Sequence, residues 1–315
     1  MNMAENLMNA VCYNSYGGGS AALKIPVPSP TADEILLKVE AASINPIDWK
    51  IQKFMIHPFT SIKFPFTSIK FPFIPVSDVA GEIVEVGRGV NNFKVGDKVI
   101  SALDMGAGGG LAEYAVAKAA LTVLRPPEVS AADGASLVTA GDHCSSCSNC
   151  GVGHYAVQLA KLGNTHVTAT CGARNMEFVK SLGADEVLDY KTPEGSALKS
   201  PSGLKYDVVI NCIEGIPWST FEPNLSTNGL VIDLTPVLGS IWTSFVQILT
   251  CSKKQLEPVF IMAPNVAEIG CLVKLVKQGK LKTVIDSRYP LSSAQKAWAK
   301  SMEGHATGKV VVVEP

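Results

Sequence analysis

The residues best suited to chemistry are two groups that fit a phosphorylated cofactor. The first is Gly151-Val152-Gly153, which precedes residues 154–161, a stretch with apolar residues at helical spacing. Glycine lets the backbone approach a pyrophosphate closely, and the N-terminus of a helix adds N–H donors and positive potential. The second is Arg174, which follows the next strand-like stretch, where an acidic residue would bind the ribose of NAD. Because a guanidinium pairs with a 2′-phosphate, these residues predict an NADP(H) site; the alternative for Arg174 is an exposed cation at a helix start.

A second candidate for chemistry is a run of cysteines at Cys144, Cys147 and Cys150, next to His143. The spacing of two residues between successive cysteines suits a zinc ion, but no second pair of ligands follows. We therefore prefer an irregular loop with incidental thiols and assign no metal site. Because residues 1–16 lack the apolar core of a secretory signal, we expect the scattered cysteines to be reduced and buried. These are Cys12, Cys171, Cys212, Cys251 and Cys271.

The composition is that of a globular protein with material for more than one core. The chain has 315 residues, of which 47% are hydrophobic and 17% charged, which excludes intrinsic disorder and favours two domains. Lysine and arginine number 27 and aspartate and glutamate 28, for a net charge of -1. We therefore expect no nucleic-acid partner, which would require a basic surface. No apolar run approaches the roughly 20 residues of a membrane-spanning helix, so we expect no transmembrane segment.

The elements that must position these residues change in character along the chain. Residues 1–125 contain short strand-like runs separated by glycine and proline, which predict a β-barrel domain. Residues 126–268 alternate between strand-like and helix-like segments, which predict a parallel, doubly wound sheet of the Rossmann type. Residues 269–315 contain helical segments and a final strand, 309–314, that we expect to return to the first domain. The predicted fold class is therefore α/β with two domains.

Five motifs resemble those of one enzyme family. They are Asn45-Pro46-Ile47-Asp48-Trp49-Lys50 and the segments 79–87, 96–99, 151–161 and 304–309. In these motifs the chain is similar to the zinc-free quinone oxidoreductase branch of the medium-chain dehydrogenase/reductase superfamily. The resemblance implies a GroES-like β-barrel catalytic domain, a Rossmann domain that binds NADP(H), and NADPH-dependent reduction of activated C=C bonds. The implied substrates are small molecules, namely enones, ketols or quinones.

The resemblance also implies roles for single residues. Asn45 and Lys50 would line the catalytic site, although Asn45 before Pro46 can instead simply hold a turn. Three residues at strand ends and one C-terminal lysine would contact the cofactor. These are Tyr190, Cys212, Thr235 and Lys309, each of which also has an ordinary structural alternative.

Two segments argue against a catalytic metal. Zinc-dependent relatives carry cysteine and histidine ligands where this chain reads Asn45-Pro46-Ile47-Asp48 and Val76-Ser77-Asp78. Neither segment contains Cys or His, so we predict no metal in the catalytic site. Without a metal, we expect the protein to position the substrate and stabilise charge, while NADPH carries the hydride.

The resemblance extends to the setting of the protein in the cell. It implies the chloroplast, either peripherally at the inner envelope or in the stroma, with the cytoplasm as the alternative. It also allows a homodimer. The sequence by itself adds only that no segment is suited to span the membrane.

One part of the sequence conflicts with a complete Rossmann domain. A buried strand of about 4–8 apolar residues should directly precede Gly151, but residues 143–150 are too polar. The nearest apolar run is 135–140, which can form either the missing first strand or the helix that links the two domains. The first strand region is therefore expected to be abnormal or truncated.

This conflict leaves three interpretations open. The chain is a working reductase with an altered turn, or a cofactor-impaired relative that acts as a non-catalytic binding protein. Alternatively, the sequence lacks a segment that the natural protein contains. A second irregularity, the tandem repeat Phe59–Pro65 and Phe66–Pro72, most simply lengthens a surface loop.

Overall fold

The computed structural model describes residues 6–53, 69–142, 152–259 and 265–314. Gly151, the cysteine run at 144–150, the first repeat copy and residues 66–68 of the second lie outside the described residues. The chain forms two compact units. The first comprises Met1–Asp142, Pro264–Gly279 and Ile285–Pro315, and the second His143–Ala263 and Lys280–Val284. Within the described ranges, no helix is both long and apolar enough to cross a membrane.

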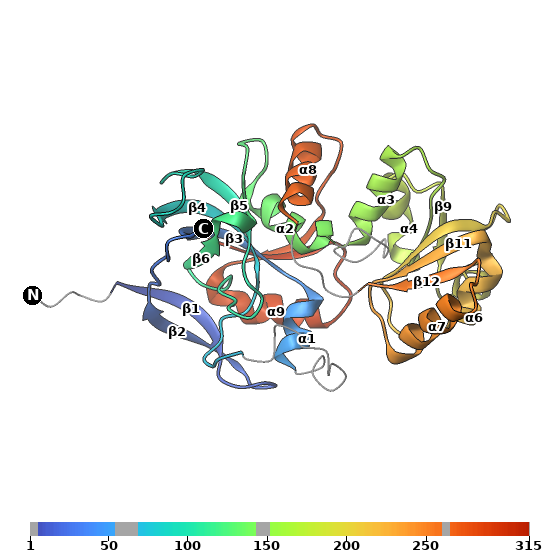
Figure 1. The fold of residues 1–315 in the computed structure, drawn as a ribbon, viewed down its shortest axis with the longest axis horizontal. Coiled ribbons are helices and arrows are strands. Elements are labelled where there is room, and N and C mark those ends of the chain that lie inside the picture. The colour runs from blue at the N-terminus through green and yellow to red at the C-terminus, as the bar shows by residue number, and fades with distance from the viewer. Residues whose placement is uncertain (1–5, 54–68, 143–151, 260–264, 315) are drawn as a thin grey trace, which may run out of the picture. The chain divides into compact units, whose positions relative to one another are not determined.

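The first unit is built on a seven-stranded sheet in which distant parts of the chain pair (Figure 1). The strand order is β13-β14-β3-β4-β5-β7, and β6 pairs with β3. A separate antiparallel hairpin consists of β1 and β2. The strands are β1 Leu7–Tyr13, β2 Ser20–Pro26, β3 Glu34–Ile44, β4 Asp78–Val86, β5 Lys98–Ala102, β6 Tyr114–Lys118, β7 Thr122–Leu124, β13 Ile285–Tyr289 and β14 Lys309–Val313.

The main hydrophobic core of the first unit joins the sheet to a C-terminal helix. Ile35 and Leu37 on β3 point to the same side, because side chains alternate along a strand, and both are fully buried. They belong to one cluster with Trp298 of α9, Ala294–Met302. Tyr13 from β1 joins this cluster, with its ring centroid 5.2 Å from that of Trp298. The core therefore fixes the C-terminal residues against the strands that hold the first part of the chain.

The final strand returns to the first unit, as expected from the sequence. Strand β14 pairs antiparallel with β3, so that Val311 lies opposite Ser43. It also pairs in parallel with β13. This pairing carries Lys309, the first residue of β14, next to the end of β3 and the start of the helix that follows it. The helix is α1, Pro46–Gln52.

Helix α2, Ala131–Asp142, decides the role of the ambiguous apolar run at 135–140. These residues are helical, and Ala135, Leu137 and Val138 are buried. The helix packs on β3, β4 and β5 of the first unit. Since a residue cannot belong to this helix and to a Rossmann strand at once, 135–140 is not available as the first strand of the second unit.

The second unit shows the consequence of that choice. Strands β8 and β9 form one parallel pair, and β10, β11 and β12 form a separate parallel sheet. A complete Rossmann sheet has the order 3-2-1-4-5-6, which would place its first strand between β8 and β10. Among the described residues, no strand joins the two groups. The strands are β8 Thr168–Cys171, β9 Glu186–Asp189, β10 Tyr206–Asn211, β11 Leu225–Asp233 and β12 Gln255–Pro258.

The split leaves two small cores in place of one. One cluster contains Cys171 of β8 and Val179 of α4, and the other contains Val231 of β11 and Leu256 of β12. Val208 in β10 is 52% exposed, although a strand in the middle of a Rossmann sheet is normally covered on both faces. The prediction of an α/β fold with an abnormal first strand region is therefore confirmed.

The helices complete the two units. Those of the first unit are α1, α2, α9 and α8 Val266–Lys277, with short 3-10 turns at Ala119–Leu121 and Leu291–Ser293. Those of the second are α3 Gly153–Leu162, α4 Met176–Ser181, α5 Pro193–Ser196, α6 Trp218–Phe221 and α7 Leu238–Leu249, with 3-10 turns at Ala173–Asn175 and Glu222–Asn224. Helix α7, which runs along β12, was not predicted from the sequence (Figure 1).

Candidate active site and cofactor-binding residues

The start of helix α1 positions the best-supported catalytic candidate, Asn45. Asn45 has an extended backbone and immediately precedes the helix, and Pro46 occupies the first helical position, which tolerates its fixed φ and missing N–H. The carboxyl group of Asp48, three residues later, reaches back and accepts a hydrogen bond from the Asn45 backbone N–H at 2.7 Å. Asp48 therefore anchors this turn and fixes the direction in which Asn45 leaves β3.

The Asn45 side chain is held by three partners from different parts of the first unit. Its Nδ2 donates to Asp78 Oδ2 at 2.8 Å and to the Ser43 carbonyl oxygen at 3.1 Å. Its Oδ1 accepts a hydrogen bond from Lys309 Nζ at 2.5 Å. Both N–H donors of the amide are thus in use, and Asn45 is 4% exposed. The side chain is therefore a fixed part of a buried network. It can interact with a ligand as a hydrogen-bond acceptor, through Oδ1.

Asp78 is the centre of this network, and it was not predicted to be a site residue. It is fully buried, yet its carboxylate accepts hydrogen bonds from four groups. They are Asn45 Nδ2, the backbone N–H of Thr139 at 2.9 Å, the Thr139 hydroxyl at 2.7 Å and the Ser77 hydroxyl at 3.3 Å. The available signal was a single acidic residue at the start of an apolar strand, which is rare unless the charge is paired.

The network contains more charge than its burial would normally permit. The Lys309 side chain lies in the interior, with 2% of the residue exposed, close to Asp48 and Asp78. Burial raises the pKa of Asp48, and the nearby charge of Asp78 raises it further, to about 8. The Asn45 N–H and the Lys309 ammonium act in the opposite direction but do not cancel these effects. At neutral pH the Asp48 carboxyl group is therefore mostly protonated.

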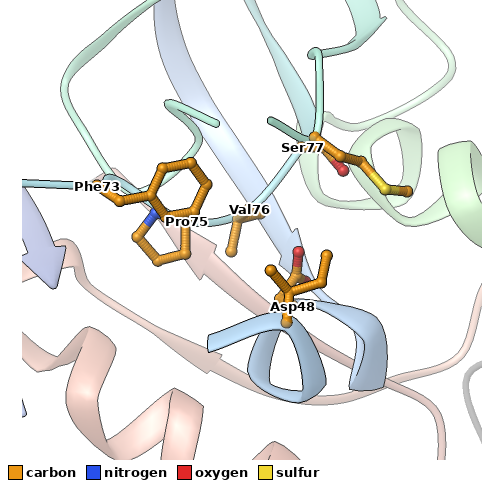
Figure 2. Close-up of a pocket in the computed structure, with 7 residues that line it drawn as sticks. Asp48, Phe73, Pro75, Val76 and Ser77 are labelled. Atoms are coloured by element: carbon orange, nitrogen blue, oxygen red, sulfur yellow. The ribbon is translucent and has the colours of Figure 1, made fainter. Parts of the chain in front are cut away.

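A small pocket opens beside this network (Figure 2). Figure 2 shows Asp48 on α1 facing the segment that carries Phe73, Pro75, Val76 and Ser77. Apart from Asp48 and Ser77 the lining is apolar, and it also includes Ile51 and Met105. A carboxyl group in an apolar pocket of this kind is a typical arrangement for binding or proton transfer.

Val76 gives this pocket an unusual wall. It has a φ of 75°, in the left-handed region that a β-branched residue rarely adopts. The Val76 carbonyl oxygen accepts a hydrogen bond from the backbone N–H of Gly110 at 2.9 Å. A side chain at position 110 would collide with Val76, so glycine is needed there. The surrounding chain thus holds a strained residue in place, as is common at ligand sites.

Lys50, the other residue predicted to be catalytic, lies on the same helix as Asp48. Its Nζ is 5.9 Å from the centroid of the Trp49 ring, which places the ammonium over an aromatic face. The residue is partly exposed and lies in the last turn of α1. Its catalytic role stays a prediction.

The residues predicted to bind the adenosine end of the cofactor meet at the carboxyl ends of β8 and β9. Arg174 is exposed in the 3-10 turn that follows β8. Tyr190 directly follows β9, and its backbone N–H donates to the Cys171 carbonyl oxygen at 3.1 Å. The backbone of Gly172 lies beside the Tyr190 ring, since a Cβ atom built there would be 3.5 Å from it, an ordinary van der Waals contact. The structure brings Arg174 and Tyr190 to neighbouring strand ends, as open α/β sheets do for ligand-binding residues.

Cys212 and Thr235 follow the next two strands. The last residues of the two strands are joined by a side-chain hydrogen bond, in which Asn211 Nδ2 of β10 donates to Asp233 Oδ1 of β11 at 3.0 Å. The Thr235 backbone N–H also donates to Asp233 Oδ1, at 3.2 Å. Cys212 and Thr235 are partly buried. Their place at strand ends agrees with the expectation, and their contact with the cofactor stays a prediction.

The remaining cofactor residues are divided between the two units. Val152 precedes helix α3, and Gly153 is its first, buried residue, whereas Gly151 lies outside the described residues. Lys309 belongs to the first unit and donates to Asn45. In the described parts of the chain, no group of three or more His, Cys, Asp or Glu side chains is arranged to hold a metal ion.

Family profiles match both parts of the chain. The alcohol dehydrogenase GroES-like domain matches residues 31–128, and a domain described as zinc-binding dehydrogenase matches residues 182–312. Neither match includes residues 129–181, which contain helix α2 and the polar run before Gly151. The region that breaks the Rossmann sheet is therefore also the region that departs from the family profiles.

Individual relatives cover nearly the whole chain. The chain is 58% identical to the chloroplast envelope quinone oxidoreductase homolog of Arabidopsis thaliana, over 98% of this chain and 99% of the relative. It is 30% identical to the chloroplastic NADPH-dependent alkenal/one oxidoreductase of the same plant, over 97% and 79%. The structure of the quinone oxidoreductase from Coxiella burnetii superposes with a TM-score of 0.83 at 26% identity, over 98% and 100%. The chain therefore belongs to the quinone oxidoreductase family within the medium-chain dehydrogenase/reductase superfamily.

Proposed function

We propose that the chain reduces activated C=C bonds of small enones or ketols, or reduces quinones, by hydride transfer from NADPH without a catalytic zinc ion. The observation that carries the proposal is the buried hydrogen bond from Lys309 to Asn45, beside Asp78. Asn45 and Asp78 belong to the two segments that hold the metal ligands of zinc-dependent relatives. Here an ammonium group, not a metal ion, supplies the positive charge next to the polar side chains.

The donor groups of the second unit fit NADPH better than NADH at the adenosine end. The turn after β8 reads Gly172-Ala173-Arg174-Asn175, which contains a guanidinium and no carboxylate. A guanidinium binds a phosphate group with two parallel hydrogen bonds, whereas a carboxylate at this position would repel it. The exposed Arg174 and the ring of Tyr190 would hold the 2′-phosphate and the adenosine. When bound, NADPH supplies the hydride.

The first unit supplies the electrostatic part of the reaction. Hydride addition to an enone places negative charge on the substrate carbonyl oxygen, and a fixed positive charge nearby lowers the energy of that state. The Lys309 ammonium is held in place by Asn45 and is shielded from water. Little reorganisation of the surroundings is therefore needed when negative charge develops on the substrate. Asn45 thus acts mainly by orienting Lys309.

The substrate class is supported by the names of the relatives. One relative is named as a quinone oxidoreductase homolog and a second as an alkenal/one oxidoreductase that depends on NADPH. Both reactions add a hydride to an electron-poor conjugated system.

The proposal is tested by following NADPH absorbance in the presence of a small enone and, separately, a quinone. We expect turnover with NADPH, weaker turnover with NADH, and no change after treatment with a metal chelator. Loss of activity on chelation, restored by zinc, would contradict a metal-free mechanism. Failure of the protein to bind NADPH at millimolar concentration would contradict the enzyme function itself.

The split sheet favours a second candidate function. Among the described residues, no strand joins β8 to β10 or leads into Val152 and Gly153, where a Rossmann domain has the strand that aims this turn at the pyrophosphate. The chain would then be a cofactor-impaired relative that binds small molecules without catalysing their reduction. This candidate predicts cooperative unfolding and ligand binding together with no turnover on any enone or quinone.

We also propose that the protein works in the chloroplast, in the stroma or peripherally at the inner envelope, and that it forms a homodimer. The location is supported by the two plant relatives described above, both of which carry that organelle in their names. Fractionation of chloroplasts that express the tagged full chain tests the location. Sedimentation of the purified protein tests the dimer.

A further inference from the structure

Reduction of a C=C bond needs a proton as well as a hydride, and we propose that the carboxyl group of Asp48 supplies this proton to the substrate from the pocket that it lines. The inference rests on the reductase function proposed above. It concerns the source of the proton, which neither the cofactor nor a metal ion provides in that reaction.

The geometry distinguishes Asp48 from the other buried carboxyl group of the network. Both oxygens of Asp78 accept hydrogen bonds, from four donors in all, so its side chain is fully engaged within the network. Asp48 accepts one, from the Asn45 backbone N–H to Oδ2. In the described parts of the chain, no other group hydrogen-bonds to this carboxyl, so Oδ1 is able to carry a proton. Two neighbouring carboxyl groups in different surroundings are a common basis for separate roles in catalysis.

The pocket gives this proton a route. Asp48 is 8% exposed, and its side chain forms part of the wall beside Ile51, Val76 and Met105. The opposing segment is held in its strained conformation by the contacts of Val76 described above. A proton leaving Oδ1 therefore enters a small pocket with room for little more than a water molecule, from which it can pass to a substrate carbon at the pocket mouth.

The charges around Asp48 keep it protonated at neutral pH. Burial and the charge of Asp78 on β4 raise its pKa to about 8, while Lys309 on β14 opposes them. Tyr13 on β1 is the other titratable group coupled to it, and its own pKa is raised by burial and by Asp48. Helix α9 also packs against α1, but its buried residues are Ala294, Ala297 and Trp298, which do not ionise. A carboxyl group with a pKa near 8 is matched to proton donation at physiological pH.

When bound, NADPH would supply a hydride that forms a C–H bond at the β-carbon of the enone. The electrons of the C=C bond would move toward the carbonyl group and give an enolate. The O–H bond of Asp48 then breaks, and its proton forms the second C–H bond, at the α-carbon. The enone has been reduced to a saturated ketone and NADPH oxidised to NADP⁺. The Asp48 carboxylate then takes up a proton from solvent through the pocket.

The test compares the wild-type protein with Asp48→Asn, in which an amide oxygen can still accept the Asn45 N–H but no acidic proton remains. We expect kcat to fall by about 100-fold or more, with an NADPH Kd within twofold of wild type. The wild-type kcat should decline above pH 8, and this decline should be absent in the variant. Asp48→Glu, which restores a carboxyl group, should regain part of the lost activity. Asp33→Asn, at an exposed carboxylate of the same unit, is the matched control and should behave as wild type.

A second measurement does not depend on turnover. The infrared difference spectrum of wild type minus Asp48→Asn should contain the stretch of a protonated carboxyl group at pH 7, which disappears as the pH is raised through 8. The absence of that band, or a variant that keeps wild-type kcat and its alkaline decline, would overturn the inference alone. A wild-type protein that binds NADPH but reduces no enone or quinone would overturn the proposed function as well.

Discussion

Lys309 and Asn45 lie 264 positions apart in the sequence and are joined by a buried hydrogen bond of 2.5 Å from Nζ to Oδ1. The bond connects the first residue of the last strand to the residue that begins helix α1. Antiparallel pairing of β14 with β3 makes it possible, since β3 ends at Ile44, opposite Val310. The C-terminal return is therefore part of the candidate site.

Removal of the ammonium group should destabilise the first unit. In Lys309→Met, Asn45 Oδ1 loses its donor and the buried Asp78 loses a nearby positive charge. We expect the free energy of unfolding at pH 7 to fall by about 1–3 kcal/mol. Urea unfolding followed by tryptophan fluorescence measures the change. Lys296→Met, at an exposed position on α9, is the control, and an equal effect in both variants would contradict the role assigned to Lys309.

The bond between Thr139 and Asp78 should be measurable as a coupling energy. Thr139→Val removes a hydroxyl that donates to a buried carboxylate at 2.7 Å, and such bonds contribute about 1.5–3 kcal/mol. We expect a loss in this range in the wild-type background and a clearly smaller loss in Asp78→Asn. A double-mutant cycle from urea unfolding gives the difference. Additive losses would show that the two residues do not interact.

Asp48 should make the stability of the protein depend on pH. Its pKa is about 8 in the folded state and about 4 in the unfolded chain, so between these values the folded state binds one more proton. Stability should therefore decrease as the pH rises from about 4 to 8, with a contribution of up to about 1.4 kcal/mol per pH unit, and level off above 8. Unfolding midpoints across this range, compared between wild type and Asp48→Asn, isolate the effect. Parallel curves for the two proteins would rule it out.

Arg174 should determine the choice between the two nicotinamide cofactors. Because the guanidinium pairs with the 2′-phosphate, which NADH lacks, Arg174→Ala should weaken NADPH binding by about tenfold or more and NADH binding little. Titration calorimetry or cofactor fluorescence measures both dissociation constants. Lys180→Ala, at an exposed lysine of the following helix, is a suitable control. Equal losses for NADPH and NADH would refute contact with the 2′-phosphate.

The split sheet should be visible in hydrogen exchange. Strand β11 is paired on both sides, whereas β10 has one partner among the described strands. Val231 in β11 is fully buried and Val208 in β10 is 52% exposed. We expect slow exchange of the β11 amides and markedly faster exchange of the β10 amides, since local opening costs less at an edge. Equal protection in both strands would indicate that β10 has a second partner.

Much of the fold follows from local patterns in the sequence. Strand-like runs separated by glycine and proline predicted the β-strands of the first unit, and helical spacing predicted α3, because these patterns depend on neighbours along the chain. The polar run before Gly151 correctly indicated an abnormal Rossmann sheet. Asn45 and Asp48 were recognisable from one short motif, since they lie in the same turn.

The tertiary structure decided what depends on residues distant in sequence. The run at 135–140 fits a helix or a strand equally well by composition, and packing on β3, β4 and β5 selects the helix. The hydrogen bond between Asp78 and Thr139 has no local signal in the sequence, because it forms only when β4 and α2 meet. The same holds for the pKa of Asp48, which depends on burial and on the charges of Asp78 and Lys309. The sequence by itself determined the family and those elements that have a clear local pattern. The burial and charge of the site required the folded chain, since both depend on residues that only tertiary packing brings together.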